Sequence, residues 1–145
     1  MGYTNYWYQT RAFTDKEWYE IKTYLLFRHT SFTLDDLDKE IKISHLSWDE
    51  DDHYIQFNGK NEKLSCEDFT LHKNIREPFY KDDKVEFNFC KTRELPYDEM
   101  VWKLLKFIKF VVLDPKDLSF QIMNDSLGDD GISYDQWKWR DRYDG

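Results

Sequence analysis

The sequence predicts an α+β protein, a two-layer sandwich in which a mainly antiparallel sheet carries two long helices on one face. Several short segments alternate apolar and polar side chains, as half-buried strands do, and they follow one another with short turns. Two longer segments have the apolar spacing of amphipathic helices. Gathering helices on one face of an antiparallel sheet buries the apolar side of both kinds of element. The 145 residues contain no internal repeat, linker or low-complexity tract, so we predict a single domain over residues 1–145.

The first two elements have clear local signals. Residues 3–9 are rich in Tyr, Trp and Thr, which predicts a strand. A helix over residues 15–28 is predicted next, because a capping box and a hydrophobic staple mark its start. These two motifs are formed by Thr14 with Glu17 and by Phe13 with Trp18.

The following part of the chain carries a concentrated run of acidic residues. Thr33 is expected to cap a short second helix that passes through Leu34 and Leu37 to Ile41. Residues 35–52 hold most of the acidic run. We interpret this run as a solvated turn between elements, because runs of charge usually face water.

Three more strands are predicted from alternating segments. They cover residues 53–59, which end in the turn signal Asn58-Gly59, residues 66–72, and a segment that begins at Val85. In the last strand, the side chains expected to face the helices are Val85, Phe87 and Phe89. Those expected on the opposite face are Glu86, Asn88, Cys90 and, if the strand runs that far, Thr92.

The second long helix is predicted from about residue 97 to residue 113. Pro96 suits its first turn, and Asp98 and Glu99 complement the helix dipole. Its broad apolar face indicates a central, largely buried helix. The polar stripe that we expect to face water consists of Lys103, Lys106 and Lys109.

The end of the chain has weaker signals. A last strand is predicted over residues 118–123, and the turn residues of 124–131 predict a loop. The tail carries Trp137 and Trp139 among charges, which indicates either a docked edge or a frayed end.

Composition and charge exclude several classes of function. The formal net charge of −8 disfavours nucleic-acid binding, which needs a basic surface. No apolar run is long enough for a membrane span and the N-terminus lacks the features of a secretion signal, so we expect a cytoplasmic protein. Neither Cys66 nor Cys90 belongs to a metal or redox motif, and both are expected to be reduced thiols. The loop at Asp130 lacks the spacing of a calcium loop, and we expect no metal and no cofactor.

Five short motifs stand out along nearly the whole chain. They are Gly2-Tyr3-Thr4-Asn5-Tyr6-Trp7, Ile55-Gln56-Phe57-Asn58-Gly59, Cys66-Glu67-Asp68-Phe69, Phe89-Cys90-Lys91-Thr92 with Pro96-Tyr97-Asp98, and Asp130-Gly131 with Trp137. In this order they resemble the motifs of a widespread family of short, single-domain, uncharacterised microbial proteins. The chain departs from that family at Asp68, where the family has Thr, in its longer acidic run and in its last segment. The resemblance implies a shared fold over a single domain and implies no activity.

The candidate site is the junction between the last long strand and the second long helix. Short polar groups, rings, a lysine and the free N–H groups of a helix start meet there, which suits a small polar or anionic ligand or a peptide. The expected ligand-binding residues are Tyr6, Asn88, Cys90, Lys91, Thr92 and Tyr97. Side chains expected to join them from neighbouring strands are Gln56, Asn58 and Asp68. The predicted function is therefore that of a small intracellular binding module.

Three alternatives stay open at this point. The same residues also fit the ordinary solvated face of an antiparallel sheet. Catalysis would need a base beside Cys90, and none of the four histidines lies at a spacing that identifies one; these are His29, His45, His53 and His72. The acidic residues and exposed rings also suit an acidic interaction protein, for instance an inhibitor or decoy, that binds a basic protein partner.

Overall fold

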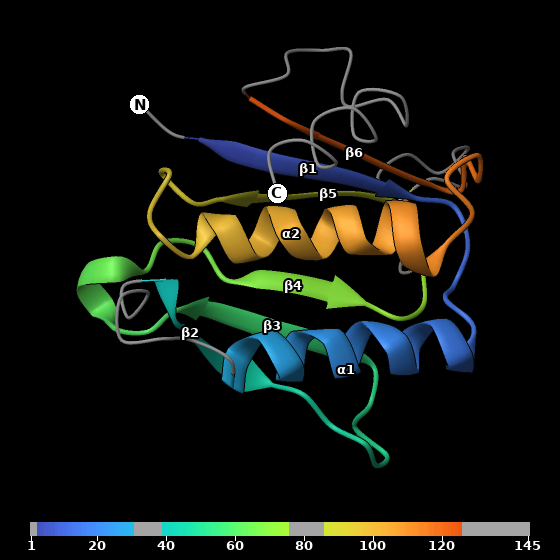
Figure 1. The fold of residues 1–145 in the computed structure, drawn as a ribbon, viewed down its shortest axis with the longest axis horizontal. Helices are drawn as coiled ribbons and strands as arrows, with labels where there is room; N and C mark the ends of the chain where they lie inside the picture. The colour runs from blue at the N-terminus through green and yellow to red at the C-terminus, as the bar shows by residue number, and fades with distance from the viewer. Residues whose placement is uncertain (1–2, 31–38, 76–85, 126–145) are drawn as a thin grey trace.

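The protein is α+β, and its described residues form two helices and two antiparallel three-stranded sheets (Figure 1). The computed structural model describes residues 3–30, 39–75 and 86–125. Its strands are β1 (Thr4–Gln9), β2 (Ile41–His45), β3 (Tyr54–Gly59), β4 (Phe69–His72), β5 (Glu86–Lys91) and β6 (Phe120–Asn124). Its helices are α1 (Asp15–Thr30) and α2 (Asp98–Phe107), with a 3₁₀ turn at Glu62–Leu64 and a π-helical turn at Ile108–Val112.

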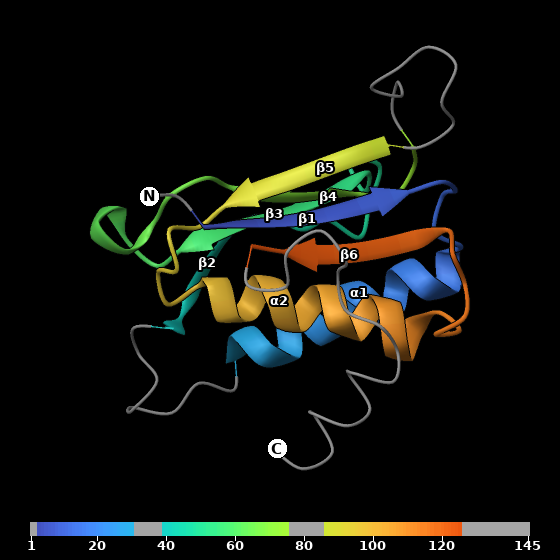
Figure 2. The same ribbon diagram turned by 90° about the horizontal axis from the view of Figure 1, so that it is seen from above.

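The six strands form two sheets where the sequence predicted one. One sheet has the strand order β5-β1-β6 and the other has the order β2-β3-β4. Both helices lie on the same side of the strands when the molecule is seen from above (Figure 2). The prediction of an antiparallel α+β fold is confirmed, and the prediction of a two-layer sandwich stays a prediction.

Local signals placed the first helix correctly. The Thr14 N–H donates to Glu17 Oε1 at 2.8 Å and the Glu17 N–H donates to Thr14 Oγ1 at 3.1 Å, which is a complete capping box. The rings of Phe13 and Trp18 stack with centroids 5.9 Å apart. The capping box satisfies N–H groups that a helix start leaves without partners, and the stacked rings set the angle at which the chain enters α1.

The predicted end of a short helix at Ile41 is wrong, because Ile41 begins strand β2. Ile41 and Ile43 turn inward while Lys42 and Ser44 are exposed, which is the two-residue period of a strand. The acidic run therefore contains a strand as well as a turn. Residues 33–38 of the predicted helix lie outside the described residues.

The predicted turn signal Asn58-Gly59 coincides with the end of β3. The 3₁₀ turn passes so close to this point that a Cβ on Gly59 would lie 1.9 Å from the Leu64 carbonyl oxygen. Glycine is needed here because of this close approach of backbone to backbone.

The face prediction for β5 is wrong. Cys90 and, just beyond the strand, Thr92 are completely buried, whereas Phe89 is half exposed. The register sets this orientation: Cys90 pairs with Asn5 and therefore shares the inner face with Trp7, two residues further along β1. A small side chain suits position 90, since the Cys90 sulfur lies 3.5 Å from the Glu67 carbonyl oxygen. Val85 lies outside the described residues.

Helix α2 is central, as predicted, with one exception in its polar stripe. Val101, Leu105 and Ile108 have no exposed surface. Lys109, expected to face water, is buried and donates to the Asp117 carbonyl oxygen at 2.7 Å. Burial lowers the pKa of Lys109, although the charge of Asp117 opposes this. The lysine supports the turn that leads to β6.

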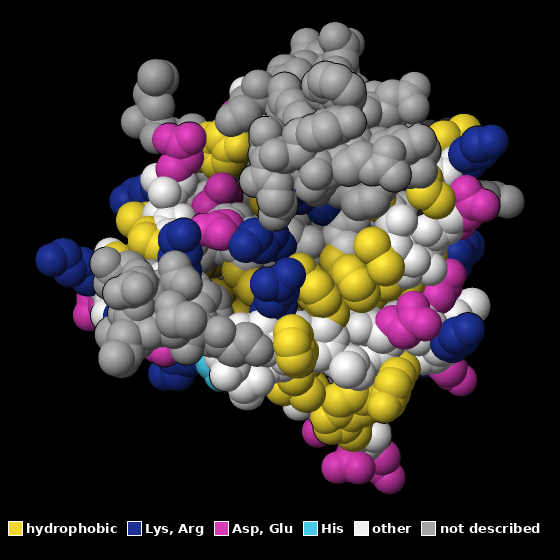
Figure 3. All heavy atoms as spheres, in the orientation of Figure 1, with side chains coloured by type: hydrophobic (Ala, Val, Ile, Leu, Met, Phe, Trp, Pro, Cys, Tyr) yellow, Lys and Arg dark blue, Asp and Glu magenta, His cyan; other side chains and the backbone are white. Residues whose placement is uncertain are grey.

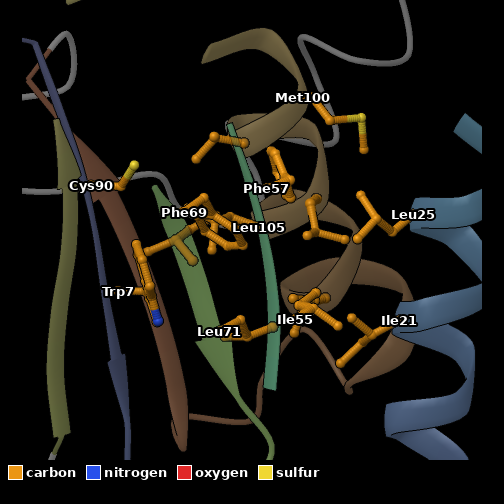
Figure 4. Packing of buried hydrophobic residues seen from close by; sticks show 14 of the residues in the cluster. Trp7, Ile21, Leu25, Ile55, Phe57, Phe69, Leu71, Cys90, Met100 and Leu105 are labelled. Carbon is orange, nitrogen blue, oxygen red and sulfur yellow. The ribbon is translucent and has the colours of Figure 1, made fainter. Parts of the chain in front are cut away.

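One apolar core connects both sheets and both helices (Figure 4). The Trp7 and Phe69 rings, one from each sheet, lie 5.0 Å apart. Phe69 also packs on Phe57 at 4.9 Å within its own sheet. Ile21 and Leu25 of α1 reach the same cluster from the helix side (Figure 4). The two sheets are therefore held together by ring packing in the core.

Candidate functional site

The strand-to-helix junction is a closed hydrogen-bonded unit. Thr92 Oγ1 donates to Asp98 Oδ1 at 2.6 Å, and Asn5 Nδ2 donates to the same oxygen at 2.6 Å. The Thr92 N–H donates to the Tyr3 carbonyl oxygen at 2.9 Å. Asn5 and Thr92 are both fully buried. These polar groups tie the end of β5 and the start of α2 to strand β1.

Tyr97 and Cys90 belong to the same closed unit. The Tyr97 hydroxyl donates to the Glu67 carbonyl oxygen at 2.7 Å, and the Cys90 thiol donates to it at 3.5 Å. The Glu67 carboxylate accepts the Lys91 backbone N–H at 3.0 Å. These bonds join the segment before β4 to the end of β5. They already use the Tyr97 hydroxyl, the Cys90 thiol and the Lys91 N–H, which were expected to bind a ligand.

The thiol chemistry of this region is unfavourable for nucleophilic catalysis. Burial, together with the nearby Glu67 carboxylate, raises the pKa of Cys90 to about 12, so that the thiol stays protonated at neutral pH. Burial likewise raises the pKa of Tyr97. Both cysteines are free, as the sequence predicted, with Cys66 partly exposed and Cys90 buried. A buried, protonated thiol is a packing group.

Backbone strain accompanies the closed junction. Arg93 and Glu94 have φ values of 55° and 56°, and the Leu95 N–H donates to the Thr92 carbonyl oxygen at 3.0 Å. Two left-handed residues in a row without glycine cost about 1–2 kcal/mol each. The turn is held because Thr92 before it is buried and Asp98 after it accepts hydrogen bonds from Thr92 and Asn5. Asn5 Oδ1 is left without a hydrogen-bond partner among the described residues.

The six predicted site residues are divided between two faces of the sheet. Asn88, Cys90, Thr92 and Tyr97 lie on the core side, with Asn88 half-buried opposite Trp7 and the other three completely buried. Tyr6 and Lys91 lie on the outer side and are accessible. The structure therefore does not bring the six together at one surface.

The three neighbouring residues expected to join the site lie in the other sheet. Gln56 Nε2 donates to Thr70 Oγ1 at 2.8 Å, and Ser44 Oγ donates to Gln56 Oε1 at 3.0 Å. Asn58 Nδ2 donates to Asp68 Oδ1 at 3.0 Å. These five side chains form the outer face of β2-β3-β4, which we call the polar face. Its groups bond mainly to one another.

The outer face of β5-β1-β6 is different and was missed by the sequence analysis. We call it the aromatic face; its side chains are Tyr6, Tyr8, Phe87, Phe89 and Met123. The Phe87 ring lies 5.9 Å from Tyr6, 5.1 Å from Tyr8 and 6.0 Å from Phe89. Phe89 is 50% exposed, and Tyr6, Tyr8 and Met123 are partly exposed. The available signal was that β1 carries rings on both of its faces, with Trp7 inward and Tyr6 and Tyr8 outward.

Two hollows lie outside the aromatic face. One, of about 370 Å³, adjoins the first turns of α2 and is lined by residues that include Pro96, Trp102 and Lys106. Its charged groups are partly neutralised, since Glu99 pairs with Lys103 at 2.8 Å and with Lys39 at 3.0 Å. The other, of about 300 Å³, lies at the end of the polar face and is lined entirely by polar residues, glycine and charged groups. Neither hollow concentrates one kind of charge.

A search of the described residues for a metal site found no group of three or more His, Cys, Asp or Glu side chains suited to hold an ion. Among the helices described, none is long and apolar enough to cross a membrane.

Comparison of the chain with protein-family models, with curated proteins and with solved structures gave no match. The resemblance to the microbial family therefore stays a prediction that depends on the five motifs alone.

Proposed function

We propose that the protein is a binding module whose aromatic face binds an extended, apolar peptide segment that carries an acidic residue. The observation that supports this most directly is the half-exposed Phe89 ring on a sheet face where other rings also reach the surface. Contiguous exposed apolar surface is uncommon on soluble proteins and usually marks an interaction site. We also propose that the fold is a two-layer sandwich and that the protein is cytoplasmic.

The shape of the aromatic face favours a peptide over a compact ligand. Tyr6 pairs with Phe89 and Tyr8 with Phe87 across β1 and β5, so that the rings follow the direction of the strands. Alternate side chains of an extended segment would contact rings arranged in this way. The two hollows described above are lined by other residues and do not extend onto this face.

Lys91 supplies a charge at one end of the face. It follows Phe87 and Phe89 on the outer side of β5 and is exposed, and its side chain forms no ion pair with the described residues. A carboxylate on the bound segment would meet this ammonium group. The proposed ligand is therefore still anionic, as the sequence predicted. The proposed site differs, because it lies on the outer face of the sheet and not at the strand-to-helix junction.

A library of displayed random peptides tests the proposal. Peptides selected on the protein should be apolar with an acidic residue, and Phe89→Ser should weaken their binding about tenfold or more, because a buried Phe contributes roughly 1.5–3 kcal/mol. Val111→Ser is the matched control, since Val111 is an exposed apolar residue on the π-helical turn after α2. Binding would be followed by fluorescence anisotropy of labelled peptides.

Two results would contradict the proposal. One is that no peptide is enriched over a control surface. The other is that selected peptides bind equally well to the wild type and to Phe89→Ser.

A second candidate function, binding of a basic protein partner, is favoured by a separate surface around Trp48. It does not depend on the aromatic face.

A further inference from the structure

An exposed aromatic surface lies between α1 and the loop that joins β2 to β3. Trp48, in this loop, is 50% exposed, and Tyr19, on α1, is 60% exposed. Their rings lie 5.6 Å apart at an angle of 60°. The loop projects from the rest of the molecule below α1 (Figure 1). We call Tyr19, Trp48 and the loop residues 47–52 the Trp48 surface.

A buried ion pair holds this surface in place. Lys22 of α1 is buried, and its Nζ donates to the Ser47 carbonyl oxygen at 3.0 Å and to Asp52 Oδ2 at 2.5 Å. The Trp18 indole N–H donates to Asp52 Oδ1 at 2.7 Å. Burial opposes ionisation of Asp52, but the hydrogen bonds from Lys22 and Trp18 outweigh it and lower the pKa of this carboxyl group. Both ends of the loop are thus fixed to the helix.

Lys22 also places its ammonium group against the Trp48 ring. Lys22 Nζ lies 3.9 Å from the centroid of the Trp48 ring, which is a cation–π contact. Half of the Trp48 side chain nevertheless remains accessible. The ring is therefore held in a fixed orientation while part of it faces solvent.

The charge around these rings is strongly acidic. Asp49, Glu50 and Asp51 are exposed and take part in no ion pair with the residues that the structure describes. Two hydrogen bonds order the loop: the Asp52 N–H donates to the Asp49 carbonyl oxygen at 3.2 Å, and the His45 side chain bonds through Nε2 to the Asp51 carbonyl oxygen at 2.9 Å. Acidic side chains project beside hydrophobic surface at this edge of the molecule (Figure 3). An approaching partner therefore meets rings rimmed by negative charge.

We propose that the Trp48 surface docks an arginine-containing segment of a partner protein. Charge complementarity favours a basic partner, because three exposed carboxylates follow Trp48 in the same loop and form no ion pair with the described residues. Arginine suits the rings better than lysine, since its planar guanidinium group stacks on aromatic faces and binds carboxylates with two parallel hydrogen bonds. The rigid loop lowers the entropy lost on binding.

The test uses labelled twelve-residue peptides of alternating Arg and Gly, Lys and Gly, or Glu and Gly, titrated into the full chain. The Arg peptide should bind at least about threefold tighter than the Lys peptide, because only the planar guanidinium group can both stack on the rings and bind a carboxylate with two parallel hydrogen bonds. Its affinity should fall as salt is raised from about 20 to about 300 mM, since screening shortens the reach of exposed charges. The Glu peptide should not bind.

Two variants separate the rings from the charges. Trp48→Leu should abolish the preference for Arg over Lys, and Tyr19→Ser is a second variant if Trp48→Leu melts at a lower temperature. The charge variant combines Asp49→Asn, Glu50→Gln and Asp51→Asn and should weaken the Arg peptide about tenfold at low salt. Its matched control makes the same change in net charge elsewhere, through Glu62→Gln, Glu94→Gln and Asp114→Asn, which are also exposed.

The outcomes are distinct. Loss of binding in the charge variant but not in its control supports docking at the Trp48 surface. Equal weakening in both would mean attraction by net charge alone and would overturn the proposal, as would equal affinity for the Arg and Lys peptides. Phe89→Ser should leave Arg-peptide binding unchanged, so this result is independent of whether the aromatic face binds its own peptide.

Discussion

The two sheets of this protein have the same number of strands and the same antiparallel pairing, yet their outer faces are opposite in character. On the polar face of β2-β3-β4, amide and hydroxyl groups of neighbouring strands bond to one another, as Gln56 does with Thr70. On the aromatic face of β5-β1-β6, rings of neighbouring strands pack side by side and remain partly exposed, as Phe89 is.

The difference indicates which face would gain more from contact with a binding partner. A polar ladder in contact with water satisfies its groups with short side chains and gains little from a partner. Exposed rings keep unfavourable contact with water, which any apolar partner would relieve. The aromatic face is therefore the better candidate for binding, although four of the six predicted site residues lie on the opposite side of the same sheet.

The largest expected effect concerns the contact that joins the sheets. Phe69→Ala should lower the free energy of unfolding by about 3–5 kcal/mol, because it leaves a cavity between Trp7 and Phe57. Phe89→Ala removes the same ring from the aromatic face and should cost less than about 1 kcal/mol. Denaturant titration of both variants measures the contrast. Similar midpoints for the two would show that the sheets are not held together by this packing.

The junction provides the next comparison, between an aspartate that bonds to two buried side chains and an aspartate on the exposed polar face. Asp98→Ala should lower the free energy of unfolding by about 2–3 kcal/mol, because it leaves the buried donors of Asn5 and Thr92 unpaired. Asp68→Ala, on the polar face, removes one acceptor from the exposed Asn58–Asp68 bond and should cost less than about 1 kcal/mol. An equal loss in thermal melts would mean that the junction is more open to water than the structure indicates.

Acid should weaken the edge of the aromatic sheet before it affects the neutral bonds of the polar face. Hydrogen bonds from Ser119, with help from Arg11, lower the pKa of Asp117 to about 2, and hydrogen bonding to Arg11 lowers the pKa of Glu17. A carboxyl group whose pKa is lower in the folded state stabilises the fold above its unfolded pKa, and this contribution disappears as pH falls through the folded value.

The stabilisation from Asp117 should therefore be lost between about pH 4 and about pH 2. Thermal melts over this range should show a steeper decline for the wild type than for Arg11→Gln, which lacks the ion pairs with Glu17 and Asp117. Parallel curves for the two proteins would contradict the assignment. Gln56→Ala serves as a control that leaves the titrating groups unchanged.

The smallest expected effect on stability is at Lys91. Lys91→Ala should change the free energy of unfolding by less than about 0.5 kcal/mol, because the side chain is exposed and the bond to Glu67 uses the backbone N–H. The same variant should weaken acidic peptides selected on the aromatic face several-fold. A large loss of stability would assign the lysine to the closed junction instead.

The sequence alone determined the elements whose signals are local. These signals come from residues that are close together in the sequence. They predicted the capping box and staple of α1, the strands β1, β3 and β6, and the buried helix α2. The same patterns also identified the strand-to-helix junction as unusual. Its polar groups are indeed brought together, by bonds to Asp98 and to Glu67.

Only the tertiary structure decided which side of each strand is buried. Alternation places Cys90 and Phe89 on opposite faces, but which face is inside depends on what packs there: the Glu67 backbone lies against Cys90, and Phe89 faces outward. In the same way, Lys109 is buried by a turn that only the packing of α2 brings near. Local spacing sets the position of a side chain relative to its neighbours along the chain, whereas burial depends on contacts between distant segments, and those contacts decided where this protein keeps its accessible surface.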